Sequence, residues 1–155
     1  MNRPKAPLSI LVVEDEFIIA MDIETMIEDA GHQVLAVASS LQDVMALPTD
    51  KAPDVALVDM QLARGSTGLQ VNSAIQKQWP DTIVVFVTAN PKKIPDDFDG
   101  AHGGIAKPFS SAGFVAALKY LEEGVCDPPP VSPEPGSFVA SPAFAAQWGV
   151  NPGER

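Results

Sequence analysis

Apolar runs of strand length alternate along the chain with segments whose apolar residues recur at helical spacing. The strand-like runs are residues 8–13, 33–38, 54–59 and 82–88, with a weaker one at 103–107. The helical patterns cover residues 16–30, 41–47 and 69–79, and a last helix that Ser110 can cap. The segment 90–100 contains two prolines and is a poor helix former. This alternation is typical of a parallel sheet covered by helices.

The connections between the runs limit how the strands can be ordered. Crossovers between parallel strands are right-handed, which leaves few possible topologies. Five strands connected in this way predict an α/β fold of the flavodoxin-like (βα)5 type, a three-layer sandwich with strand order 2-1-3-4-5. In such sheets ligands bind beyond the carboxyl ends of the strands, where strands one and three lie side by side.

The prolines are spread unevenly and divide the chain. Seven of the fifteen fall in the last 31 residues. We therefore predict an N-terminal arm (1–7), a globular domain (8–124) and a Pro-rich C-terminal tail (125–155). The tail also carries Phe144 and Trp148, and so has more apolar surface than a solvated spacer needs.

Charge and composition exclude several classes of function. Twenty acidic residues against ten basic ones give a net charge of −10. This balance argues against nucleic acid or an anionic membrane as a partner. No apolar run approaches the roughly 18 residues of a membrane span, and the first residues do not resemble a signal peptide. A single cysteine, Cys126, excludes an internal disulfide, and we expect a cytoplasmic protein.

Charged and polar residues stand at the ends of the strand-like runs, where a ligand is expected. Glu14 and Asp15 follow the first run, and Asp59 ends the third. Thr88 ends the fourth run and Lys107 the fifth. Each residue alone has an ordinary explanation, such as capping a turn. Together, and with the first and third strands as neighbours, they predict one shared site.

These residue types suit phosphoryl chemistry at a metal ion. Crowded carboxylates repel one another unless a cation or proton intervenes, and an oxygen-only cluster suits Mg²⁺. A lysine supplies a mobile positive charge for phosphoryl oxygens, and a threonine supplies a neutral donor. A carboxylate beside such a metal can act as a nucleophile and form an aspartyl-phosphate.

Four short motifs contain the residues of this predicted site. They are Val13-Glu14-Asp15, Val58-Asp59-Met60, Val87-Thr88-Ala89 and Lys107-Pro108-Phe109. In order and spacing they resemble the signature of the CheY-like receiver domains of two-component response regulators, over about residues 8–124.

The resemblance to receivers implies a role for each residue. Asp59 would accept a phosphoryl group from a histidine kinase or phosphotransfer protein. Mg²⁺ would be bound by Asp15, Asp59 and the backbone carbonyl of Gln61, and by Glu14 through water. The phosphoryl group would be bound by two switch residues, Thr88 and Lys107.

The chain departs from the usual receiver pattern at several positions. Ala63 and Thr67 stand where receivers usually carry Pro and Gly, and Gly68 follows one residue later. The stretch 59–68 is more similar to receivers of alphaproteobacterial general-stress regulators. Gly104 stands where receivers usually carry an aromatic switch residue. Together these features resemble an atypical single-domain receiver.

Three classes of function are compatible with an acidic site on this fold. The leading interpretation is a switch, not an enzyme, that binds a protein partner when phosphorylated or acts as a phosphate sink in a relay. The alternative is a magnesium-dependent phosphatase or phosphotransferase with an aspartyl-phosphate intermediate. Gln61, however, stands where enzymes of the haloacid-dehalogenase type need a second acid. A flavin site is disfavoured because the acids after the first strand would repel its phosphate, and no small-molecule substrate is expected.

Two expectations concern residues outside the site. His32 and His102 lie in predicted turns and are interpreted as solvent-exposed. The missing ring at Gly104 and the prolines of the preceding segment leave apolar surface exposed. Either the tail folds back and covers this surface, or the tail is a flexible Pro-rich segment that ends in a partner-binding motif. In the first case, Phe144 and Trp148, spaced i and i+4, would supply one face of a short helical turn.

Overall fold

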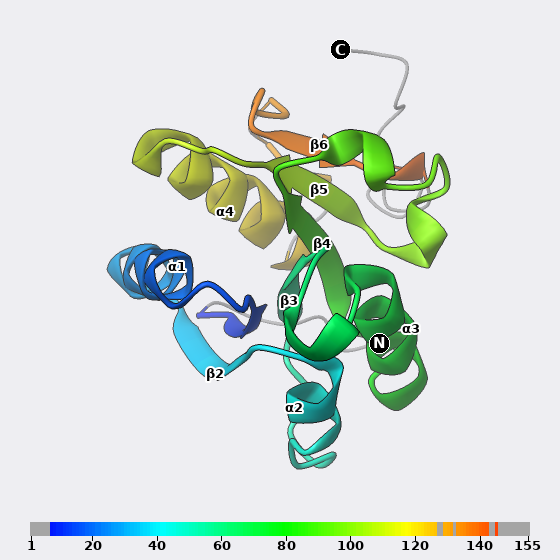
Figure 1. Cartoon of the computed structure of the whole chain (residues 1–155). Helices are drawn as coiled ribbons and strands as arrows, with labels where there is room; N and C mark the ends of the chain where they lie inside the picture. The colour runs from blue at the N-terminus through cyan, green and yellow to red at the C-terminus, as the bar shows by residue number, and fades with distance from the viewer. Residues whose placement is uncertain (1–6, 127–128, 132, 143–144, 146–155) are drawn as a thin grey trace.

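The computed structural model describes residues 7–126, 129–131, 133–142 and 145 of the chain. In this part, six strands form one sheet in the order β2-β1-β3-β4-β5-β6 (Figure 1). The strands are β1 (Ser9–Val13), β2 (Gln33–Ala38), β3 (Val55–Asp59), β4 (Ile83–Thr88), β5 (Gly103–Ala106) and β6 (Phe138–Ala140). The first five are parallel in the predicted order, and β6 is antiparallel to β5.

Helices cover both faces of the sheet and complete a flavodoxin-like three-layer fold. The α-helices are α1 (Phe17–Asp29), α2 (Leu41–Met45), α3 (Gly68–Gln78) and α4 (Ser111–Cys126). Helices α1 and α4 lie on one face, and α2 and α3 lie on the other (Figure 1). As expected, Ser110 caps α4, because its Oγ accepts the Gly113 N–H at 2.9 Å. None of these helices has the length and apolar character needed to cross a membrane.

The segment between β4 and β5 forms short 3₁₀ turns in place of an α-helix. These turns are η2 (Pro91–Lys93) and η3 (Phe98–Gly100), and a third, η1 (Ala63–Gly65), follows β3. Proline lacks the N–H that a helix interior needs, so Pro91 and Pro95 restrict this segment to single turns. The sequence correctly predicted a poor helix here.

Alternation along the strands divides the buried apolar side chains between two cores. In β1, Ile10 and Val12 pack under α1 and α4, whereas Leu11 and Val13 pack under α2 and α3. Strand β4 is buried along its whole length, as a central parallel strand should be. Both faces of β4 are therefore covered, and the carboxyl ends of the central strands are left open to carry a site.

Part of the predicted tail belongs to the sheet. Helix α4 continues two residues beyond Gly124, and β6 then pairs with the outer edge of β5. Phe138 is buried with 1% of its surface exposed, and the Ser137 hydroxyl donates to the Gly113 carbonyl at 2.8 Å. Phe144 and Trp148, which we expected to form a covering turn, lie outside the described residues.

The apolar surface at Gly104 is covered by the segment between β4 and β5. A Cβ atom placed at Gly104 would lie 3.3 Å from Ile94 Cδ1 and 3.7 Å from Phe98 Cε2. The turns between β4 and β5 therefore fill the space of the missing ring. The described part of the tail also lies beside this position, because Val139 of β6 pairs with Gly104. The expected covering turn at Phe144 and Trp148 lies outside the described residues.

Candidate functional site

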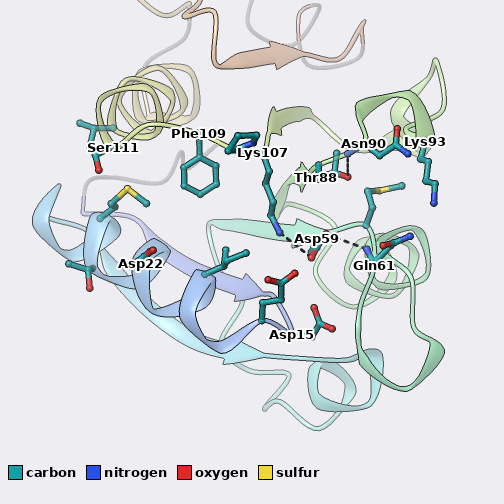
Figure 2. A pocket seen from close by; sticks show the side chains of 18 of the residues that line it. Asp15, Asp22, Asp59, Gln61, Thr88, Asn90, Lys93, Lys107, Phe109 and Ser111 are labelled. Atoms are coloured by element: carbon teal, nitrogen blue, oxygen red, sulfur yellow. Dashed lines mark hydrogen bonds and ion pairs between the residues drawn. The ribbon is translucent and has the colours of Figure 1, made fainter.

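Three carboxylates meet at the carboxyl edge of the sheet. Glu14 and Asp15 follow β1 directly, and Asp59 is the last residue of β3. Strands β1 and β3 pair in register up to Val13 and Val58, which brings the next residues of both strands together. One carboxylate oxygen from each of the three residues lies within 4.8 Å of the others. Figure 2 shows Asp15 and Asp59 at the mouth of the same pocket.

Lys107 lies between two of these carboxylates. Its Nζ donates to Glu14 Oε1 at 2.6 Å and to Asp59 Oδ2 at 3.2 Å. The position of Lys107 follows from β5, whose last pairing places Ala106 beside Thr88 of β4. Lys107 also donates its backbone N–H to the Thr88 carbonyl at 2.8 Å. The ammonium group thereby offsets part of the negative charge of the cluster.

Burial and charge shift the pKa values of this pair. Burial raises the pKa of Glu14 to about 7, and the negative charge of Asp59 acts in the same direction. The hydrogen bonds from Lys107 and from the Glu16 N–H oppose this rise. Burial alone would lower the pKa of Lys107. The hydrogen bonds and negative charges of Glu14 and Asp59 outweigh the effect of burial, so the pKa of Lys107 is raised. Lys107 is therefore charged at neutral pH, whereas Glu14 can take up a proton there.

Gln61, in the loop after β3, and Thr88, at the end of β4, line the same pocket as Asp59. The Gln61 backbone N–H donates to Asp59 Oδ1 at 3.3 Å. Thr88 is buried at the end of β4, and its Oγ1 accepts the Asn90 N–H at 3.0 Å. The predicted metal-binding and switch residues thus lie around Asp59, whereas Gly104 is not among the residues that line this pocket. The Thr88 hydroxyl also stabilises the turn after β4.

An open groove of about 990 Å³ extends from the carboxylates between α1 and α4. Asp22 and Met26 of α1 line one side, and Ser111 and Val115 of α4 line the other (Figure 2). Phe109 lies between them. The Asp59 carboxylate is therefore reachable from solvent along this groove. The sequence did not predict the groove, because it arises from the packing angle of two helices far apart in the chain.

The donor set of the cluster fits a hard divalent cation. The cluster found among the described residues consists of three carboxylates and so offers oxygen atoms only, a combination that suits Mg²⁺. Asp15 is exposed and Asp59 is 8% exposed, so a hydrated ion can approach from the solvent side. Glu14 is only 3% exposed and bonded to Lys107, which agrees with a more indirect contribution.

Gly68 explains why the chain tolerates its unusual loop after Asp59. A Cβ atom at Gly68 would lie 2.5 Å from the Asp59 carbonyl oxygen, closer than real Cβ atoms come. The start of α3 therefore packs against the Asp59 backbone only if residue 68 is glycine. The 3₁₀ turn η1 and the bridge between Gln61 and Thr67 take up the longer connection.

Residues 10–119 match the family model described as the response regulator receiver domain. The chain belongs to this family. The match includes the three carboxylates, Lys107 and the five parallel strands. The receiver fold is thus established by the sequence match and by the strand order together.

Among curated proteins, this receiver is similar to the phyllosphere-induced regulator PhyR of Methylorubrum extorquens. The two are 36% identical over 111 residues, which cover 70% of this chain and 41% of PhyR. It is also 26% identical over 115 residues to the transcriptional regulatory protein PdtaR of Mycobacterium tuberculosis, covering 73% of this chain and 56% of PdtaR. The receiver therefore spans about half the length of these relatives.

Solved structures give the same result. The receiver domain of PhyR from Erythrobacter litoralis superimposes with a TM-score of 0.67 at 25% identity, covering 81% of this chain and 96% of that one. PhyR from Brucella abortus gives a TM-score of 0.60 at 31% identity, covering 74% of this chain and 46% of that one. The predicted similarity to general-stress regulators of the PhyR type is confirmed.

Asp15→Asn is expected to raise the melting temperature of the metal-free receiver at pH 8 by about 2 °C or more. The substitution removes one of three crowded negative charges, of which Lys107 offsets only part. The same variant should bind Mg²⁺ more weakly. Asp22→Asn, which removes an exposed charge from the same groove, is the matched control and should change neither quantity. A lower melting temperature with unchanged Mg²⁺ affinity would contradict a common carboxylate site.

Proposed function

We propose that this chain is a response regulator whose receiver is phosphorylated on Asp59 by a histidine kinase or a phosphotransfer protein. Its output is phosphorylation-dependent binding to another protein or the draining of phosphoryl groups from a relay. The convergence of Glu14, Asp15 and Asp59 with Lys107 carries this proposal. Membership of the receiver family supports the same role.

In the proposed transfer, one carboxylate oxygen of Asp59 attacks the phosphorus atom of a phosphohistidine. A P–O bond forms, the P–N bond breaks, and the imidazole nitrogen leaves with the bonding electron pair. The Lys107 ammonium at 3.2 Å and the Gln61 N–H at 3.3 Å hold the Asp59 carboxylate in one orientation. The lysine is also placed to pair with the new phosphoryl oxygens, and the Thr88 hydroxyl can donate to them.

Asp15 and Asp59 are the carboxylates that would hold Mg²⁺ directly, with the Gln61 backbone carbonyl as a third ligand and Glu14 acting through water. When bound, the ion supplies positive charge that neutralises the phosphoryl oxygens during transfer. The chain itself contributes the nucleophile, the lysine and the buried hydroxyl. Such a receiver phosphorylates itself once and does not turn over a free phosphomonoester.

Asp59→Asn is expected to abolish acyl-type phosphoryl labelling, because the amide cannot act as the nucleophile. The measurement is incorporation of label from a phosphorylated histidine kinase, or from a small phosphodonor, with Mg²⁺ and with chelator. Wild-type protein should be labelled only with Mg²⁺, and Asp22→Asn should behave as wild type. Acid-labile labelling that persists in Asp59→Asn, or steady turnover of a phosphomonoester, would refute the proposal.

A further inference from the structure

The outer edge of β5 contains a hollow that another part of the chain fills. A Cβ atom at Gly103 would lie 2.5 Å from Phe138 Cζ, 2.8 Å from Phe138 Cε1 and 2.9 Å from the Val139 carbonyl oxygen. The phenyl ring thus occupies the volume that any side chain at residue 103 would take. It continues into the core under α4, where it lies 5.5 Å from the Tyr120 ring. The ring and the hollow are complementary in shape.

Backbone pairing fixes the segment that brings this ring. Strand β6 pairs antiparallel with β5, with Phe138 opposite Ile105 and Ala140 opposite Gly103. Both inward-facing residues of β6 are buried, whereas Val139 between them is 43% exposed. Beyond the strand, the Ser141 N–H donates to the His102 carbonyl at 3.0 Å. The binding of β6 to β5 therefore depends on a short stretch of backbone pairing and on one large side chain, that of Phe138.

Strand β6 lies outside the part of the chain that matches the receiver family. The receiver match ends at residue 119, and β6 begins nineteen residues later. Five prolines occur in the eleven residues between α4 and β6. An extended proline-rich stretch of this length spans about 34 Å, and α4 rises only about 20 Å between Gly113 and its end. The connection can therefore return along α4 and hold β6 at high local concentration.

We propose that the β5 edge with its hollow at Gly103 is a binding site for an extended peptide strand. The ligand carries a phenyl ring opposite Ile105 and a small residue opposite Gly103. Residues 137–141 are the ligand that occupies this site within the same chain. The inference concerns recognition of a strand and does not depend on phosphorylation of Asp59.

The first experiment separates the site from its ligand. A specific protease sequence is inserted beside Val131, which is 90% exposed, and the full-length chain is cut there. The C-terminal fragment should remain bound, and an added peptide of residues 134–142 should displace it. A peptide with Phe138→Ala should compete at least about a hundredfold less well, and one with Val139→Ala should compete as well as wild type.

Each outcome of the cutting experiment decides the proposal. Displacement by the Phe138→Ala peptide at the same concentration as by the wild-type peptide would overturn it. Loss of the fragment without binding of added peptide would do the same. A cut chain that unfolds supports the site if the wild-type peptide restores the fold, and opposes it if the peptide does not.

A second experiment tests the hollow in the uncut chain. Gly103→Ala should lower the melting temperature strongly in the wild-type chain, because the new methyl group displaces the Phe138 ring. In a Phe138→Ala background only the contact with the Val139 carbonyl oxygen remains, so the same substitution should lower the melting temperature by less. An undiminished effect in this background would show that the ring does not occupy the hollow.

Discussion

A chain that ends at Val131 is expected to unfold with a melting temperature about 10 °C or more below that of the full-length protein. The truncation removes β6, and with it the Phe138 ring that is buried against Tyr120. Loss of a buried phenyl ring typically costs about 3–5 kcal/mol, a large part of the total stability of a domain. The expected shift follows from that free energy.

Thermal unfolding followed by far-UV circular dichroism measures this effect. Val139→Ala, at an exposed position of the same strand, is the control and should shift the melting temperature by no more than about 2 °C. An unchanged melting temperature after truncation at Val131 would mean that β6 contributes no stability to the sheet.

The receiver should lose about 3 kcal/mol of stability through His102 as the pH falls from 7 to 4. Burial lowers the pKa of His102 from 6.5 to about 4. Below pH 6.5 the unfolded chain binds a proton at this residue that the folded chain does not bind until pH 4. The contribution of neutral His102 to the free energy of unfolding is therefore complete above pH 6.5, and it is lost as the pH falls from 6.5 to 4. Proton uptake on Nδ1 would also remove the acceptor of the Val84 N–H, at 3.0 Å.

His102→Asn isolates this effect, because asparagine can accept the Val84 N–H without titrating in this range. The measurement is urea unfolding at pH 7 and pH 4, and the variant should lose about 3 kcal/mol less than wild type between them. Glu14 acts in the opposite direction, since its raised pKa makes the folded chain bind the extra proton between pH 7 and 4.5. Its contribution is common to both proteins and cancels in the difference. Equal losses would contradict a buried neutral His102.

Local patterns in the sequence were sufficient to predict the sheet and most of the site. The predicted strand 33–38 agrees with β2, and the predicted helix 69–79 differs from α3 by one residue at each end. The strand order followed from the handedness of crossovers, which is independent of sequence detail. Because strand ends converge in this order, Asp15, Asp59 and Lys107 could be placed together before any geometry was known.

Features that depend on distant partners were predicted less well. His32 and His102 were expected in solvent, but each accepts a backbone N–H at the start of a strand, from Leu8 and Val84. His32 is 6% exposed and also contacts Glu122 of α4 at 3.0 Å. A histidine in a turn carries no local signal of such a partner. The direct contact between Glu14 and Lys107 was missed for the same reason, as the two residues are 93 positions apart.

Strand β6 is the clearest case of a structure that local sequence does not specify. Phe138-Val139-Ala140 is short and surrounded by prolines, so it resembles a linker with a few apolar residues. Its pairing depends on Gly103, which has no side chain of its own to indicate a contact. Only the high apolar content of the tail indicated that part of it packs on the domain.

The bridge that Lys107 makes between Glu14 and Asp59 gives the site an internal counter-ion. A divalent cation that binds these oxygens has to share them with an ammonium group that is already hydrogen-bonded to two of the carboxylates. A bound cation would compete with the Lys107 ammonium, so its binding would release less free energy than at a site with three unpaired carboxylates. An ammonium group displaced from Glu14 and Asp59 would be able to turn toward an incoming anion. Lys107 can in this way couple the binding of a cation at the carboxylates to the binding of an anion at the same site.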